Sequence, residues 1–138
     1  MADKATKIEY AYVMVPDQPG RGAKLLSALK AARVNLVAYA GFPAGRGLAQ
    51  LVFVPESMAA LVRAVRRHGW KLSAKKHAFL VTGGDRVGAV SDWLARLADA
   101  RISVTATHAV SARNRSYAMI IWVEPRDYEK AASALGAR

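Results

Sequence analysis

The chain has 138 residues, of which 53% are hydrophobic and 22% are charged, as in one small globular domain or two that share a core. No apolar run reaches the roughly 18 residues of a membrane span, and the polar start lacks a signal-like apolar stretch, so we expect a cytoplasmic protein without membrane contact. Cysteine is absent, which excludes disulfides, thiolate metal sites and cysteine nucleophiles.

The net charge of +11 favours anionic partners such as nucleic acid or acidic small molecules. The charge is spread evenly, because residues 1–70 carry 10 basic and 4 acidic residues while residues 71–138 carry 11 and 6. The densest basic stretch begins with Arg63, Arg66 and Arg67, which have helical spacing and are typical of a solvated helix face. Charge alone therefore does not define a nucleic-acid-binding protein.

The first half of the chain predicts the element order βαββαβ. A strand that ends at Pro16 is followed by a helix opening at Gly20 and Gly22, with its apolar stripe at helical spacing. Two further strands flank a turn-rich connection, and a second helix stops near Gly69. The predicted ranges are strands over 10–15, 35–40, 48–54 and 70–73, the turn over 41–47, and helices over 20–32 and 55–69.

The second half predicts the order βαββα, with the same spacing of strand and helix patterns. Its first helix carries Val90, Trp93, Leu94 and Leu97 on one face. The predicted strands cover 79–82, 102–110 and 117–123, and the last helix covers 127–135. The chain ends there, so this half lacks a fourth strand.

The two halves are related by an internal repeat. Asp17-Gln18-Pro19-Gly20 and Asp85-Arg86-Val87-Gly88 lie 68 positions apart, and residues 12–36 laid on 80–104 give 7 identities in 25. Pro55 and Pro125 are 70 apart, which places a slip of two in the loop between the second and third strands. We predict an α+β protein of tandem ferredoxin-like repeats, βαββαβ over 1–74 and βαββα over 75–138, with helices on one face of antiparallel sheets.

Two features of the second half favour a homo-oligomer, either a dimer or a tetramer. The missing fourth strand leaves the 79–82 edge to be covered by another segment or another chain. The strand over 117–123 is apolar on both faces, although helices are expected on one face only.

Each half resembles the ACT domain, a small ligand-binding regulatory module. The resemblance rests on a strand ending in Val13-Met14-Val15-Pro16, the Asp17–Gly20 loop, the leucines of the following helix and Ala32-Arg33-Val34-Asn35-Leu36. The second copy keeps Asp85 and Gly88 but has Val87 for the proline and Ser103 for the asparagine. The resemblance implies binding of an amino acid or another small effector where two domains meet, between the loop of one and the second strand of its neighbour.

The expected ligand-binding residues follow from that placement and fit its chemistry. A helix N-terminus suits a carboxylate, glycines allow close approach, and an asparagine offers both a donor and an acceptor. The aspartate of the first loop either binds an ammonium group or caps the helix, and Arg86 either grips a carboxylate or is a solvated surface arginine. The residues are Asp17, Gln18, Gly20, Arg21, Gly22, Asn35 and Leu36, with Asp85, Arg86, Gly88 and Ser103 as the second set.

No catalytic site, cofactor or metal is expected. His68, His77 and His108 fall in different elements, and no HExxH, GxSxG or Walker motif is present. We therefore favour a stand-alone regulatory protein that binds an amino acid and acts on a separate, unidentified protein, or a simple binding protein.

Two alternatives remain at this stage. The segment 115–122 partly meets the octapeptide of RNA-recognition motifs, but Met119 stands at a base-stacking position. The matching segment 46–53 has lost both stacking aromatics. RNA binding is thus less favoured, and a ligand-free oligomerisation module is the other alternative.

Overall fold

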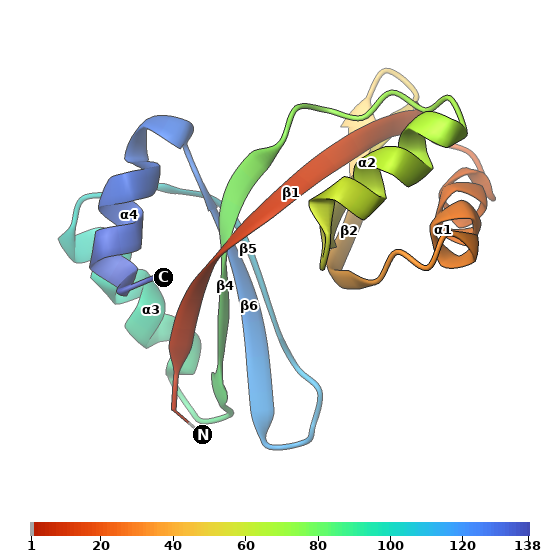
Figure 1. The fold of residues 1–138 in the computed structure, drawn as a ribbon. Coiled ribbons are helices and arrows are strands. Elements are labelled where there is room, and N and C mark those ends of the chain that lie inside the picture. Colours follow the sequence, from red (N-terminus) through yellow and green to blue (C-terminus); the bar gives the residue numbers. More distant parts are fainter. Residues whose placement is uncertain (1) are drawn as a thin grey trace. The chain divides into compact units, whose positions relative to one another are not determined.

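The computed structural model describes residues 2–138, and the chain forms two compact units (Figure 1). The first unit is Glu9–Lys76. The second unit is His77–Arg138 together with the described residues up to Ile8.

In the first unit, three strands carry two helices. Its elements are β1 (Lys4–Pro16) from Glu9 onward, α1 (Arg21–Ala31), β2 (Leu36–Gly45), β3 (Leu48–Pro55) and α2 (Met58–Arg67). The strand order is β2-β3-β1, and both pairs are antiparallel, with Val13 opposite Leu51 and Tyr39 opposite Phe53.

The core of the first unit follows from the two periodicities of its sequence. Alternate residues of β1 point to the same side, so Ala11, Val13 and Val15 are all buried. They pack in one cluster with Leu25 and Leu29, which lie four residues apart on α1. This sheet is therefore covered by helices on the face that carries these residues.

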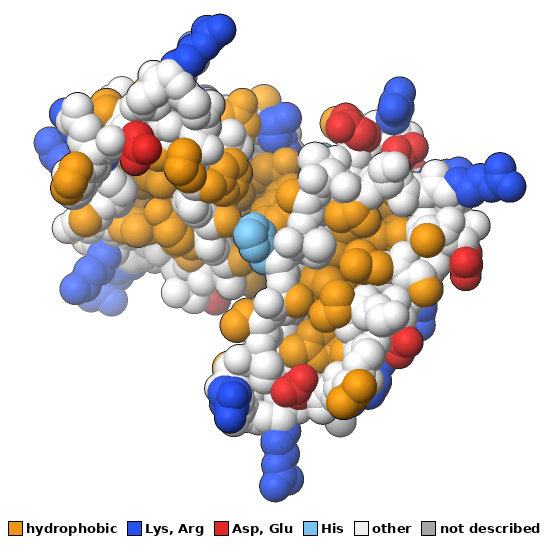
Figure 2. All heavy atoms as spheres, turned by 180° about the vertical axis from the view of Figure 1, so that it is seen from behind, with side chains coloured by type: hydrophobic (Ala, Val, Ile, Leu, Met, Phe, Trp, Pro, Cys, Tyr) orange, Lys and Arg blue, Asp and Glu red, His pale blue; other side chains and the backbone are white. Residues whose placement is uncertain are grey.

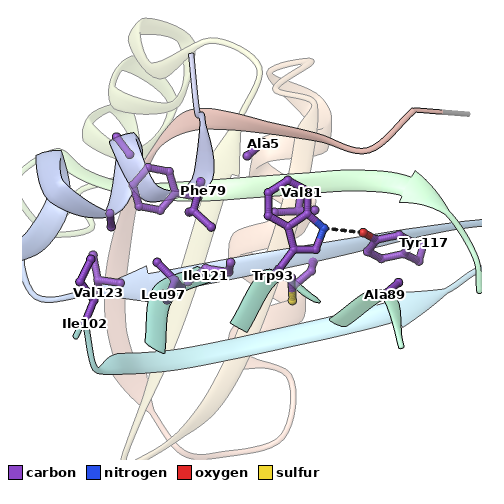
Figure 3. Close-up of a cluster of buried hydrophobic side chains, with 14 residues drawn as sticks. Ala5, Phe79, Val81, Ala89, Trp93, Leu97, Ile102, Tyr117, Ile121 and Val123 are labelled. Carbon is purple, nitrogen blue, oxygen red and sulfur yellow. Dashed lines mark hydrogen bonds between the residues drawn. The ribbon is translucent and has the colours of Figure 1, made fainter. Parts of the chain in front are cut away.

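In the second unit, the beginning of β1 lies beside β4 in the strand order β1-β4-β6-β5. The other elements are β4 (Lys76–Gly84), α3 (Ala89–Asp99), β5 (Val104–Ser111), β6 (Ser116–Val123), a 3-10 turn η1 (Pro125–Asp127) and α4 (Tyr128–Leu135). β6 pairs antiparallel with both β4 and β5. Figure 3 shows the core, where Phe79 and Val81 of β4 lie with Trp93 and Leu97 of α3.

α1 and α3, the first helix of each unit, begin and end in the same way. Gly20 precedes α1 at φ 84° and Gly88 precedes α3 at φ 85°, a left-handed conformation that glycine adopts without strain. After the helices, Arg33 and Arg101 have φ 58° and 60°. The slip of two predicted from the prolines does not lie in the loop between the second and third strands, because β3 and β6 still begin 68 positions apart. It lies after these strands, since α2 and α4 begin 70 positions apart.

Three predicted boundaries are wrong. β1 begins at Lys4 rather than at residue 10, so residues 2–8 belong with the second unit and not with a repeat over 1–74. The predicted strand over 70–73 is reduced to a single bridge between Leu72 and Val13. The predicted turn over 41–47 is strand as far as Gly45, because β2 continues its pairing with β3.

The longer β1 also removes one argument for an oligomer. The edge of β4 that was expected to be open is covered by the beginning of β1 from the same chain. Ala5 of this segment is 5% exposed and belongs to the core cluster of the second unit. The oligomeric state thus stays a prediction that rests on the apolar strands alone.

Candidate functional site

The first candidate site lies at the start of α1, where the loop 17–20 turns from β1 into the helix. The Asp17 amide donates to the Gly47 carbonyl at 2.8 Å, which fixes the loop against the β2–β3 turn. The Arg21 guanidinium donates to the Gln18 side-chain oxygen from Nη2 at 3.1 Å. No side chain caps α1 and its first turn holds no acid, so Asp17 is not the helix cap. The Arg21 amide donates to the Gln18 carbonyl at 3.3 Å, which leaves the next amides of the first turn to an anion.

Tyr39 of β2 is a residue of this site that the sequence analysis missed. Its hydroxyl would lie 3.6 Å from a Cβ built on Gly22 and 3.1 Å from one built on Gly41, so both glycines leave room for it. The ring packs against Phe53, with the ring centroids 5.6 Å apart. The only available signal was an aromatic residue two positions before a strand glycine.

Asn35 and Leu36 are not brought to the start of α1. They follow the other end of this 11-residue helix, about 16 Å away along its axis. The Asn35 side chain donates to Glu56 Oε1 at 2.7 Å. A pocket of about 430 Å³ lies here, lined by Leu26, Leu29, Lys30, Arg33, Val34, Asn35 and Leu36. Within the first unit, the loop before α1 and the start of β2, which were predicted to form one site, therefore lie apart.

The second candidate site is a pocket of about 270 Å³ at the start of α3. Three predicted residues of the second set line it, and Asp85 accepts a hydrogen bond from Ser111 Oγ at 2.8 Å. Ser103 does not line this pocket, because it follows the opposite end of α3. The lining residues are Asp85, Arg86, Gly88, Ala89, Val90, Ser91, Ala109, Val110, Ser111 and Tyr117.

Arg86 contacts two carboxylates of this chain, and its predicted contact with a ligand carboxylate stays a prediction. Its guanidinium lies 2.9 Å from an Asp3 oxygen and 3.2 Å from an Asp92 oxygen. The hydrogen bond to Asp3 is the largest cause that raises the pKa of Arg86 above its ordinary value, followed by the one to Asp92. Arg86 is therefore not a lone solvated arginine.

Tyr117 joins this cluster from β6 and is 6% exposed. Its hydroxyl accepts from Trp93 Nε1 at 2.7 Å, which Figure 3 shows, and donates to Asp3 Oδ2 at 3.2 Å. Burial is the largest cause that raises the pKa of Tyr117 above its ordinary value, and the Asp3 charge raises it further.

This pKa direction predicts how Tyr117 titrates. The folded state holds the phenol proton more tightly than the unfolded state does, so stability from this group is present below pH 10 and is lost as pH rises through the folded pKa. The difference between the phenolate absorbance of the wild type and of Tyr117→Phe should have its midpoint above pH 10. A difference curve centred below pH 10 would contradict the buried environment.

The two aromatic residues of the segment 115–122 are not exposed to RNA bases. Tyr117 faces the core, and Trp122 is 9% exposed with the His108 ring against it at 5.8 Å. On the face shown in Figure 2, Lys and Arg side chains are scattered around the periphery rather than gathered in one patch. Stacking on exposed rings, which sequence-tolerant RNA binding uses, has no support in these two residues.

Two of the three histidines pack on aromatic rings in their own units. His68 packs on Trp70 and His77 on Tyr128, with centroids 5.3 and 5.5 Å apart. Within residues 2–138, no three His, Asp or Glu side chains are grouped closely enough to hold a metal ion.

Several solved structures share this fold. A protein from Bacteroides thetaiotaomicron is 14% identical, with 96% of this chain and 88% of that chain covered and a TM-score of 0.82. The ligand-free regulatory subunit of aspartate kinase from Thermus thermophilus is 16% identical, with 98% and 93% covered and a TM-score of 0.64. The regulatory subunit from Thermus flavus is 18% identical, with 98% and 94% covered and a TM-score of 0.57. No protein family and no curated protein matched the sequence.

These similarities confirm the predicted α+β fold and are consistent with the predicted resemblance to ACT domains. The tandem ferredoxin-like arrangement stays a prediction. The chain has the architecture of regulatory subunits of aspartate kinase. None of the described helices is long and apolar enough to cross a membrane.

Proposed function

We propose that this chain is a regulatory, non-catalytic protein that binds a small carboxylate-bearing effector, an amino acid, at the start of α1. The proposal is carried by one observation: Arg21 forms no ion pair with a carboxylate among the described residues. Its guanidinium bonds to the neutral Gln18 side chain. An arginine without an acid, beside a helix start without a cap, offers charge and donors to an incoming carboxylate.

The remaining groups fit the other parts of an amino acid. The exposed Asp17 carboxylate can accept from the ammonium group, while Gly22 keeps the backbone accessible beside Tyr39. Asn35 and Leu36 would complete the site from a neighbouring domain or a second copy, since they lie at the far end of α1 in their own unit. A ligand held by two domains favours the arrangement in which both contact it, and this difference in affinity is the basis of regulation of a separate target protein.

The fold similarity supports a regulatory role, because the solved relatives named above include regulatory subunits and not catalytic ones. RNA binding through the basic surface stays the alternative function, and a binding assay that includes an RNA can detect it.

The proposal predicts that Arg21→Gln weakens effector binding about 10- to 100-fold, the usual worth of a charge-assisted hydrogen bond. Isothermal titration calorimetry against the twenty amino acids and a short mixed-sequence RNA identifies the effector class and then compares the variants. Arg63→Gln, on the exposed face of α2, removes the same charge and should leave affinity unchanged. Equal affinity of wild type and Arg21→Gln, or binding of RNA alone, would refute the site.

Gly20 is not a suitable position for this test. Its φ of 84° is strained for any β-branched residue, so a loss of binding could come from a distorted loop. Arg21 is the better choice because it lies in regular helix and its side chain is exposed.

A further inference from the structure

The carboxylate of Asp3 contacts Arg86 and Tyr117 and lies against Gly83, all in the second unit. We call these three residues the receptor. Arg86 Nη1 lies 2.9 Å from Asp3 Oδ2 and donates to Oδ1 at 3.2 Å. The Tyr117 hydroxyl donates to Oδ2 at 3.2 Å. The Asp3 side chain is 20% exposed, whereas the Arg86 partner Asp92 is 66% exposed. Asp3 is therefore the more enclosed of the two carboxylates on Arg86.

Gly83 of β4 supplies the space for this carboxylate. A Cβ built on Gly83 would collide with the Asp3 carboxylate and would lie 2.9 Å from Tyr117 Cε1. Gly83 has an ordinary backbone conformation, so its missing side chain matters for room and not for φ. The notch, the guanidinium and the phenol together fit the shape and charge of one carboxylate.

The Asp3 segment is held in place by contacts outside the receptor. Ala5 lies in the core beside Phe79 and Val81, as Figure 3 shows, and the Lys7 amide donates to the Arg138 carbonyl at 3.0 Å. These contacts present the carboxylate at a high local concentration to Arg86, which lies 83 positions later in the sequence.

We propose that the start of α3 is a receptor for small carboxylates whose resident ligand is Asp3 of the same chain. The second unit is thereby closed to free effectors while its N-terminal segment is docked. The pocket of about 270 Å³ shares Arg86 and Tyr117 with the receptor, so a free carboxylate has room beside both groups once Asp3 is absent. This inference does not depend on effector binding at α1. In the internal repeat, Gln18 holds the position of Arg86, 68 positions earlier, so the loop before α1 lacks this arginine.

The experiment removes Asp3 and supplies a free carboxylate. Thermal unfolding of Asp3→Ala is followed in sodium acetate or sodium formate and compared with sodium chloride at equal ionic strength. We expect a saturable rise of about 4 °C for Asp3→Ala in either carboxylate salt, and none for the wild type. The double variant Asp3→Ala with Arg86→Gln should not respond.

A matched control separates the receptor from any lost ion pair. Glu9→Ala removes the carboxylate of a surface pair with Lys75, where the Nζ–Oε2 distance is 3.1 Å and both side chains are about half exposed, and it should not respond to acetate. If Asp3→Ala is unfolded in chloride, acetate should restore its folded signal, and Asp3→Asn, which keeps the side-chain shape, serves as the second variant. Equal responses of wild type and both Asp3 variants, or a response that survives Arg86→Gln, would overturn the proposal.

Discussion

Replacing Phe79 by alanine is expected to lower the free energy of unfolding by about 3–5 kcal/mol. Phe79 is 0% exposed and lies in the centre of the second unit, on β4. Its ring stacks on Tyr128 of α4, with centroids 4.6 Å apart and planes 10° from parallel. The substitution removes this contact and leaves a cavity that the paired strands β4 and β6 cannot close.

Urea unfolding measures this loss, with Val87→Ala as the control. Val87 is also an apolar residue of the second unit, but it is 104% exposed, so its truncation removes no buried surface. We expect a change within about 0.5 kcal/mol for that variant. Equal effects of the two substitutions would mean that Phe79 is not in the core.

The sequence predicted the helices and the central strands because local patterns determine them. Leu25 and Leu29, or Trp93 and Leu97, lie one helical turn apart after a glycine, and this spacing is sufficient to place α1 and α3. Residues 2–8 gave no such signal, since Ala5 is the only one of them in the hydrophobic core cluster. Their strand conformation comes from pairing beside β4, a tertiary contact that local propensity does not encode.

In the candidate sites too, local sequence patterns predicted some residues, whereas contacts between distant segments were not predicted. The glycine loops located both helix starts, and Asp85, Arg86 and Gly88 do line one pocket. The contact of Arg86 with Asp3 joins residues 83 positions apart, and no spacing rule predicts it. Tyr39 and Tyr117 were missed for a related reason, because each reaches its site from another strand of the sheet.

Deletion of residues 2–8 is expected to destabilise the second unit by at least about 3 kcal/mol. The deletion removes the strand beside β4 and with it several backbone hydrogen bonds, each worth about 0.5–1.5 kcal/mol. It also uncovers the core at Ala5 and exposes the β4 edge to association with other chains. The first unit, Glu9–Lys76, keeps all its residues.

Hydrogen exchange can localise this effect and separate it from general unfolding. Amides of β4 and β6 should lose protection in the truncated protein, while those of α1 and β3 retain more of theirs. A variant with Lys4→Ala and Thr6→Ala keeps the backbone of the segment and should retain protection. A synthetic peptide of residues 2–9 should restore it in trans, and the same peptide with Asp3→Ala should do so less well, because it lacks the carboxylate that Arg86 and Tyr117 bind. Full protection of β4 without the segment would show that this edge needs no covering strand.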